Sequence, residues 1–331
     1  MDLPLCSALF VAFALSLYVL LDGFDLGVGA LLLLQADEKL RDRMVDSITP
    51  TWDGNETWLI MAGVGLLAGF PIAYGILLPA FYIPLIVMLL GLGLRGVSFE
   101  FRYQVDRRRR IWDLAFGAGS IIAALMQGFI VGGLVQGIAV TDDHFSGSVL
   151  DVFRAFPALT ALAVLTGYVV LGAGWLHLKA TSKLLDFARL SLWVGTPMFA
   201  GFFAATCVAS AFVQPRVQEA WTSHPAPLGL IAAIFATVAV LLLVRSTGRE
   251  PAVRPFLFGL ILFACGVGGL GIVIFPNIVP FRLSLWDAAS ATLSHVFMLA
   301  GAAVVTPIVL AYSAFAYRVF RGKTPEQGWE S

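Results

Sequence analysis

The sequence predicts an all-α polytopic membrane protein with about nine transmembrane helices. Of the 331 residues, 59% are hydrophobic and only 13% are charged, whereas ordinary globular domains carry about 25% charged residues. The apolar residues also form runs long enough to cross a bilayer as helices. We therefore expect one integral membrane domain over residues 1–331 and exclude a water-soluble fold.

Nine apolar runs follow one another along the chain, each of about 20 residues or more, which is the length of one helical crossing. The expected spans are 5–34, 57–74, 76–95, 112–138, 155–176, 187–213, 226–244, 256–279 and 291–317. The second and third spans are expected to form a helical hairpin, with a tight turn near Tyr74 and Gly75, after Pro71.

Basic residues are distributed very unevenly between the two predicted sides. One side holds 18 of the 21 Lys and Arg residues, in segments 35–56, 95–111, 177–189, 245–254 and the tail from Arg318. Because cytoplasmic loops carry the excess of Lys and Arg, the N-terminus is expected outside and the C-terminus in the cytoplasm. The 21 acidic residues balance the basic ones, so no net charge indicates binding to nucleic acid.

The candidate metal ligands are few and scattered. Cys6, Cys207 and Cys265 lie in apolar stretches without the C-x-x-C-H spacing of haem attachment, so they are interpreted as packing residues. Of the four histidines, only His295 falls well within a predicted span. It is expected to be buried and hydrogen bonded, with a contact to lipid, quinone or a partner as the alternative. The chain is therefore expected to bind no haem and no metal by itself.

Two carboxylates, Asp22 and Asp25, lie inside the first predicted span. Burying an ionised Asp near the centre of a membrane helix costs about 2.5–3.5 kcal/mol, so such residues indicate function. Gly23 and Gly27 have the spacing that lets a second helix approach closely. At about 1.5 Å per residue, Asp25 lies about 30 Å from the outer start, in the cytoplasmic half. Two interpretations stay open: proton-carrying or partner-holding groups, or a pair capped or hydrated at the helix end.

A second acidic cluster lies in the segment Trp52–Trp58, where the second span begins. Asp53 is expected to be an N-cap and Glu56 the N3 residue of a capping box, and capping alone could account for both acids. Asp53 and Glu56 nevertheless lie on the same membrane side as Asp22 and Asp25. The four carboxylates are therefore expected to converge at one cytoplasmic mouth, a geometry that suits proton uptake.

Two other patterns have simpler interpretations. The dipeptide Trp-Asp recurs as Trp52-Asp53, Trp112-Asp113 and Trp286-Asp287, which indicates an interfacial Trp followed by a capping Asp. The run Arg107–Arg110 is interpreted as an anchor on the positive side that contacts anionic lipid.

The strings Asp22–Gly29 and Trp52–Leu59 closely resemble subunit II of the cytochrome bd-type quinol oxidases. Arg95-Gly96 with Phe99–Arg102, and Leu285–Ala288 before the last span, are further landmarks of that family. The short chain and the Glu56-Thr57 variant are most similar to the cyanide-insensitive branch.

This resemblance implies a nine-helix subunit of two four-helix bundles plus a peripheral helix, in the bacterial cytoplasmic (inner) membrane. Its partner would be a similar subunit I, which carries the quinol site and all three haems: two b-type and one d-type, or b-type in place of d. The heterodimer oxidises quinol and reduces dioxygen to water, so this chain alone would hold no complete active site. The resemblance leaves open a structural quinone in this chain and a small single-span third subunit.

The resemblance also assigns roles to residues. Asp53 occupies the aspartate position of a motif associated with a proton channel at the subunit interface, and Asp25 belongs to a motif near it. Asp22 and Glu56 are added to this path from spacing and membrane side alone. Two alternatives stay open: a secondary transporter, which also carries intramembrane carboxylates, and a purely structural assembly subunit.

Overall fold

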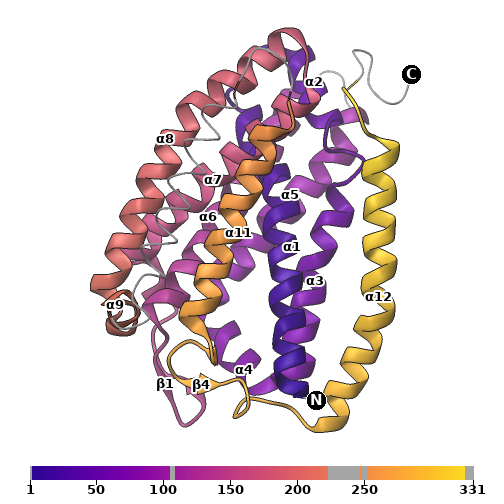
Figure 1. Cartoon of the computed structure of the whole chain (residues 1–331). Coiled ribbons are helices and arrows are strands. Elements are labelled where there is room, and N and C mark those ends of the chain that lie inside the picture. Colours follow the sequence, from indigo (N-terminus) through magenta and orange to yellow (C-terminus); the bar gives the residue numbers. More distant parts are fainter. Residues whose placement is uncertain (1, 105–108, 223–246, 248–251, 325–331) are drawn as a thin grey trace.

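The structure, a computed structural model, describes residues 2–104, 109–222, 247 and 252–324. Within these described ranges, seven helices are long and apolar enough to cross a membrane: α1 (Leu3–Leu32), α5 (Tyr82–Gln104), α6 (Arg109–Gln136), α7 (Ala155–Lys179), α8 (Ser182–Val213), α11 (Arg254–Ile274) and α12 (Thr292–Val319). They run roughly side by side along one long axis, together with α3 (Trp52–Gly69) (Figure 1). The predicted all-α polytopic membrane fold is confirmed.

Short elements connect the long helices at the two ends of the molecule. In the part of the chain that the structure describes, they include the α-helices α2 (Glu38–Asp46), α4 (Pro71–Ala80) and α9 (Pro215–Thr222) and the 3-10 helix η2 (Asp151–Phe153). Two small antiparallel pairs join β1 (Val140–Thr141) to β2 (His144–Phe145) and β3 (Asn277–Val279) to β4 (Leu283–Ser284). Helix α2 lies at one end of the molecule, and α4, β1 and β4 lie at the other (Figure 1).

The predicted hairpin between the second and third spans is wrong. Tyr74 and Gly75 do not form a turn but lie inside α4. Helix α3 ends earlier because Phe70 leaves the helical region, with φ −140° and ψ 63°, and the next residue, Pro71, cannot donate a backbone hydrogen bond. Proline is favoured at the first position of a helix, so a new short helix begins there instead of a direct return.

One predicted span, 226–244, lies outside the described residues. The count of nine spans and the division into two four-helix bundles plus a peripheral helix therefore stay predictions. The other eight predicted spans each overlap a long helix. Helix α5 shows the largest shift, since it begins at Tyr82 and continues to Gln104 instead of covering 76–95.

Helix α1 is the central element of the packing. It contacts α3, α6, α7, α11 and α12, and every residue from Asp22 to Leu32 is buried. The predicted close approach of a second helix is confirmed, and that helix is α7: a Cβ atom on Gly27 would overlap the Tyr168 carbonyl, and one on Gly172 would overlap the Gly27 backbone. The two backbones meet because neither glycine has a side chain.

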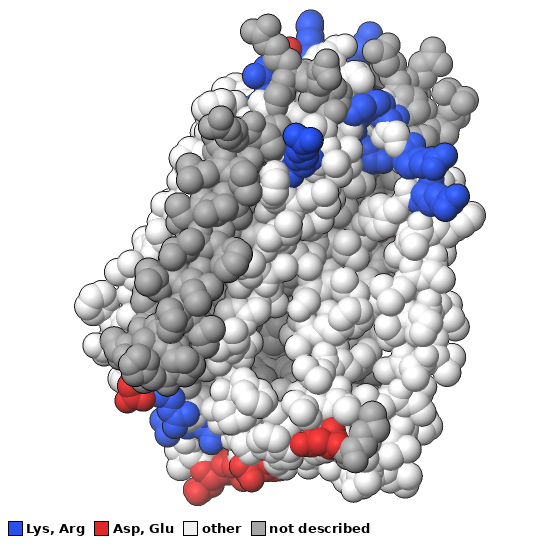
Figure 2. Space-filling view, viewed as in Figure 1, with Lys and Arg blue, Asp and Glu red and all other residues white. Residues whose placement is uncertain are grey.

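Charged side chains separate between the two ends of the molecule. On the face shown in Figure 2, most Lys and Arg residues gather at the end that carries α2 and the end of α12. The visible Asp and Glu residues lie mainly at the opposite end, which holds the start of α1. The apolar belt between these ends is the surface that a bilayer would cover.

Candidate functional site

Arg95 on α5 is the centre of a buried ionic site. Its Nη1 lies 2.7 Å from Oδ1 of Asp22 on α1, and both side chains are fully buried. Its Nη2 donates a hydrogen bond of 2.9 Å to Oε2 of Glu56 on α3. A buried charge is stable only when it is paired, so the guanidinium joins three helices through two carboxylates.

Asp25 lies one helical turn beyond Asp22 and has a different partner. Its Oδ2 accepts a 2.8 Å hydrogen bond from Nδ2 of Asn55 on α3, and the Asn55 Oδ1 accepts a 2.9 Å bond from the Tyr317 hydroxyl on α12. The other oxygen of Asp25, Oδ1, is buried without a hydrogen-bond partner among the described residues. Asp25 is therefore held by an amide where Asp22 is held by a cation. We call Asp22, Asp25, Asn55, Glu56 and Arg95 the Arg95 cluster.

The Arg95 cluster contains three carboxyl groups and one guanidinium. Like charges that share a dry site disfavour each other, and an unbalanced buried charge is expensive. A proton bound by one of the carboxyl groups would leave two carboxylates with one guanidinium, and so a smaller excess of negative charge in the cluster.

Asp53 lies outside this buried site, on the exposed side of α3. With Glu56 it lines a cavity of about 240 Å³ between α3 and α5, whose other walls include Trp52, Leu92 and Gly96. The Glu56 side chain is 26% exposed and bonded to Arg95. Glu56 therefore connects the open cavity to the buried carboxylates.

The expected convergence of four carboxylates holds in part. The structure brings Asp22 and Glu56 together on one guanidinium, and Asp25 belongs to the same buried cluster through Asn55. Asp53 shares only the outer cavity with Glu56.

The predicted capping box in α3 is wrong. Thr51 is the N-cap residue and makes no side-chain capping bond. Asp53 is the second residue of the helix, and Glu56 lies too far along to cap it. Glu56 pairs with Arg95 on α5 instead.

A chain of neutral polar residues lies in the bundle near Asp22. Gln127 Nε2 donates a 2.8 Å bond to the Tyr18 hydroxyl, and the Tyr168 hydroxyl donates a 2.6 Å bond to Gln127 Oε1. No pattern in the sequence indicated this chain, because each of its residues stands alone in an apolar run.

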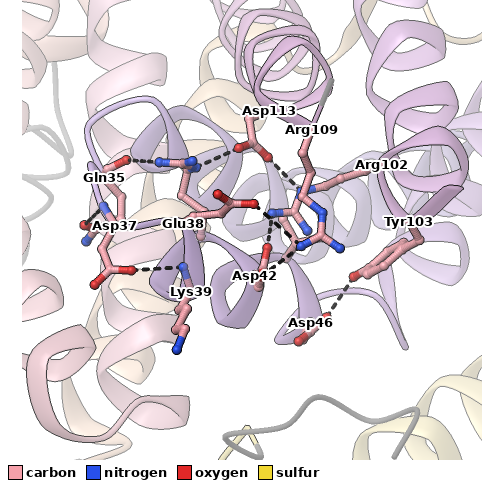
Figure 3. A network of polar contacts seen from close by, with 12 residues as sticks. Gln35, Asp37, Glu38, Lys39, Asp42, Asp46, Arg102, Tyr103, Arg109 and Asp113 are labelled. Atoms are coloured by element: carbon pink, nitrogen blue, oxygen red, sulfur yellow. Dashed lines mark hydrogen bonds and ion pairs between the residues drawn. The ribbon is translucent and has the colours of Figure 1, made fainter. Parts of the chain in front are cut away.

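A second ionic site lies at the end of the molecule that carries α2 (Figure 3). Asp113 on α6 accepts a 2.7 Å bond from Arg102 Nε on α5 and a 2.6 Å bond from Arg41 Nε on α2. Arg102 also donates to Asp42 at 2.5 Å, and Arg109 donates to the same carboxylate at 3.3 Å. We call Arg41, Asp42, Arg102, Arg109 and Asp113 the Arg102 cluster.

The Arg102 cluster corrects two interpretations. Asp113 was expected to cap a helix at the membrane interface, but it lies inside α6 with its side chain only 1% exposed. Arg109 was expected to anchor lipid, but it faces Asp42 and Glu38. The remaining basic residues of that run include Arg107 and Arg108, which lie outside the described residues.

His295 is buried, as expected, and its Nδ1 shares a 2.7 Å hydrogen bond with the Ser7 hydroxyl. It lies near the start of α12, whereas Tyr317, which donates to Asn55 of the Arg95 cluster, lies near the end of that helix. Within the described ranges, no group of three or more His, Cys, Asp or Glu side chains could hold a metal ion.

Comparison with known proteins gives one consistent result. The family model described as cytochrome bd terminal oxidase subunit II matches residues 3–320. The chain is 30% identical to the cytochrome bd-I ubiquinol oxidase subunit 2 of Escherichia coli strain K12, over 98% of this chain and 95% of that protein. It is also 30% identical to a probable cytochrome oxidase subunit 2 of Haemophilus influenzae, over 91% and 90%.

A solved structure has the same fold. The bd oxidase of Geobacillus thermodenitrificans contains a chain that superimposes with a TM-score of 0.77 at 17% identity, over 97% of this chain and 99% of that one. Since the family model covers nearly the whole sequence, this chain belongs to the cytochrome bd terminal oxidase subunit II family.

Proposed function

We propose that this chain is subunit II of a bacterial inner-membrane oxidase that oxidises quinol and reduces dioxygen to water. Its role in the complex is to support a haem-bearing subunit I and to contribute to the uptake of protons from the cytoplasm. The observation that carries the proton role is the Arg95 cluster, which joins buried carboxylates to an open cavity through Glu56. The proposal requires neither a structural quinone in this chain nor a third small subunit.

The haems belong to subunit I in this proposal, two b-type and one d-type, or b-type in place of d. Among the described residues, the two helical histidines, His177 and His295, do not form an axial pair for one haem. They lie at opposite ends of the molecule, since the C-terminal end of α7 lies beside the end of α12. No step is therefore assigned to a haem in this chain.

The residues of this chain would act on protons in two stages. Asp53 and Glu56 line the outer cavity, where carboxylates can exchange protons with water. Asp22 and Asp25 lie behind them and maintain a negative potential that attracts protons, because the Arg95 cluster holds three carboxyl groups and only one guanidinium. Arg95 moderates that potential and holds α1, α3 and α5 together. Transfer onward would pass from the cavity to the partner subunit.

Replacing the two aspartates that the family resemblance singles out tests the proton role. We expect Asp25→Asn and Asp53→Asn to leave the haem content of the complex largely intact and to slow quinol-driven oxygen consumption by roughly tenfold or more. The amide keeps the shape of the carboxylate and cannot carry a proton. Asp25→Asn is the variant more prone to disturb assembly, since Asp25 is fully buried.

The matched control is Asp143→Asn, an exposed residue with φ 57° in the β1–β2 turn. Asn tolerates this left-handed conformation as well as Asp does, so this variant should be active. Near-normal oxygen consumption in both test variants, at equal haem content, would favour a purely structural subunit.

The proposed orientation places the end that carries α2 in the cytoplasm and the N-terminus outside. It is supported by the excess of Lys and Arg at that end (Figure 2). Reporter fusions after Arg110 and after Lys323 should therefore read as cytoplasmic, and a fusion after Asp143 as external. A reversed signal at any of the three sites contradicts this orientation.

A further inference from the structure

The amide of Asn55 stands between a carboxyl group and a hydroxyl group. Its Nδ2 donates to Asp25, with a longer contact of 3.4 Å to the Leu21 carbonyl, and its Oδ1 accepts from Tyr317. Asn55 is only 1% exposed, so no bulk water replaces either partner. Both ends of the amide therefore depend on protein groups.

The two side-chain partners of Asn55 differ in whether they can donate or accept a hydrogen bond. A hydroxyl group can donate or accept a hydrogen bond, whereas an ionised carboxylate can only accept and a protonated carboxyl group can also donate. Thr51, whose hydroxyl can also donate or accept, lines the same small pocket as Asn55 and Tyr317. Tyr317 can thus donate to Asn55 or, with Asn55 reversed, accept from it.

We propose that Asn55 and Tyr317 form an adjustable hydrogen-bond pair that satisfies Asp25 in both its ionised and its protonated form. When Asp25 is ionised, Nδ2 faces the carboxylate and Tyr317 donates to Oδ1, as in the structure. When Asp25 is protonated, the amide turns by half a rotation: Oδ1 accepts from the carboxyl group and Nδ2 donates to the Tyr317 hydroxyl. No helix has to move.

Tyr317 is suited to this role because its ring is fixed and its hydroxyl is not. The ring packs edge to face against Trp175, with ring centres 6.1 Å apart. The hydroxyl can rotate about its C–O bond while remaining next to Asn55. Tyr317 is therefore a positioning residue that acts on Asp25 through Asn55. The Arg95 guanidinium that holds Asp22 can only donate, so Asp22 has no comparable freedom.

The inference rests on the proposed function in one respect, namely that Asp25 changes its protonation state. The charged and titratable groups that act on Asp25 from the surrounding helices are Asp22 on α1, Glu56 on α3, Arg95 on α5 and Tyr317 on α12. Substitutions at Asn55 and Tyr317 leave the first three unchanged. Any change at Asp25 in those variants can then be assigned to the hydrogen-bond pair.

The test compares Tyr317→Phe with Tyr312→Phe in the assembled oxidase. Both changes remove one hydroxyl from α12, but the Tyr312 side chain is exposed and has no hydrogen bond to Asn55, although it lines the same small pocket between α3 and α12. Two quantities are measured: the infrared carboxyl band that disappears in Asp25→Asn, and the pH profile of quinol-driven oxygen consumption. In Tyr317→Phe the band should move and the profile should shift by about one pH unit, the effect of one hydrogen bond. Tyr312→Phe should change neither.

A second variant, at Asn55, tests whether the effect of Tyr317→Phe comes from the lost hydrogen bond and not from altered packing. Asn55→Leu should shift the same band, and the double variant Asn55→Leu with Tyr317→Phe should add nothing, because both residues act as one unit. An unchanged band in Tyr317→Phe overturns the inference, as does an Asp25 that never shows a carboxyl band at any pH at which the complex is stable. Normal turnover in Asp25→Asn would instead overturn the proposed proton role, and a band shift in Tyr317→Phe would still support the pair.

Discussion

The Arg95 and Arg102 clusters both pair arginines with carboxylates, but carboxylates are in excess in the first and arginines in the second. In the Arg102 cluster each oxygen of Asp113 accepts a bond from a different arginine, so the carboxylate is fully neutralised. In the Arg95 cluster one guanidinium serves Asp22 and Glu56, and Asp25 has only an amide. The comparison therefore distinguishes a carboxylate that is fully paired with arginines from a site in which carboxyl groups outnumber arginines.

The positions of the two clusters fit this difference. The Arg102 cluster joins the short helix α2 to α5 and α6 (Figure 3), so it fixes a connection at the end of the molecule. The Arg95 cluster lies among helices α1, α3 and α5, next to the open cavity. A set of fully paired charges is suited to holding helices together, whereas a site with an excess of carboxyl groups is suited to proton exchange.

The largest effect on stability is expected from Asp113→Asn. This change leaves Arg41 and Arg102 buried beside each other without their shared counterion, and an uncompensated buried charge costs about 3–5 kcal/mol. The variant should accumulate poorly in membranes, with a clear loss of thermal stability of the assembled complex. Assembly measured by immunoblot and haem content checks this expectation.

The comparison predicts that Asp25→Asn accumulates much better than Asp113→Asn, although both residues are buried aspartates on long helices. If both variants assemble equally well, the difference in charge balance does not decide the roles of the two clusters.

An intermediate effect is expected from Glu56→Gln. Gln keeps an oxygen that can accept from Arg95 and removes one of the two negative charges that face the guanidinium. Because the Glu56 side chain is partly exposed, assembly should be close to normal. Oxygen consumption should fall several-fold, since the group that joins the outer cavity to the buried acids can no longer exchange a proton. A matched change in the other cluster, Asp42→Asn, should leave turnover per haem unchanged.

The buried stripe of α5 shows what the sequence could have predicted about these sites. Its buried residues follow helical spacing from Pro84 through Met88 and Gly91 to Arg95, Ser98 and Arg102. Two arginines on the core face of a membrane helix must pair with carboxylates. The spacing of Arg95 and Arg102 on this face could therefore have predicted two buried ionic sites. The predicted span 76–95 ended at Arg95 and left Arg102 in the connection that follows, and this boundary was wrong, because α5 continues through that segment to Gln104.

Other features were open to prediction in part. The carboxylates Asp22 and Asp25 stood out because the surrounding span is apolar, and the glycine spacing correctly indicated a tightly packed partner. Hydropathy does not identify that partner as α7, because helix pairing depends on contacts between distant segments. Asp42 and Arg41 could not be assigned to Arg102 or Asp113 for the same reason.

The smallest effect on stability is expected at the ion pair of Asp151 and Arg154. This exposed pair can be compared with the two buried clusters. The side chains are 40% and 63% exposed and lie three residues apart. The backbone N–H of Ser148 and the Arg154 guanidinium hold the pKa of the Asp151 carboxyl below its ordinary value of 3.8. Because the pKa is lower in the folded protein, the carboxylate stabilises the fold above pH 3.8, and this contribution is lost as the pH falls through the folded value.

Solvent and salt screen such an exposed pair, and Asn at position 151 can still accept the bond from Ser148. Asp151→Asn should therefore lower the melting temperature of the complex only slightly at neutral pH, and less still in high salt. The difference between the variant and the unchanged protein should shrink as the pH falls, which a melting series at decreasing pH would detect. If Asp151→Asn lowered the melting temperature at neutral pH as much as Asp113→Asn, burial and charge balance could not be what distinguishes the ion pairs of this subunit.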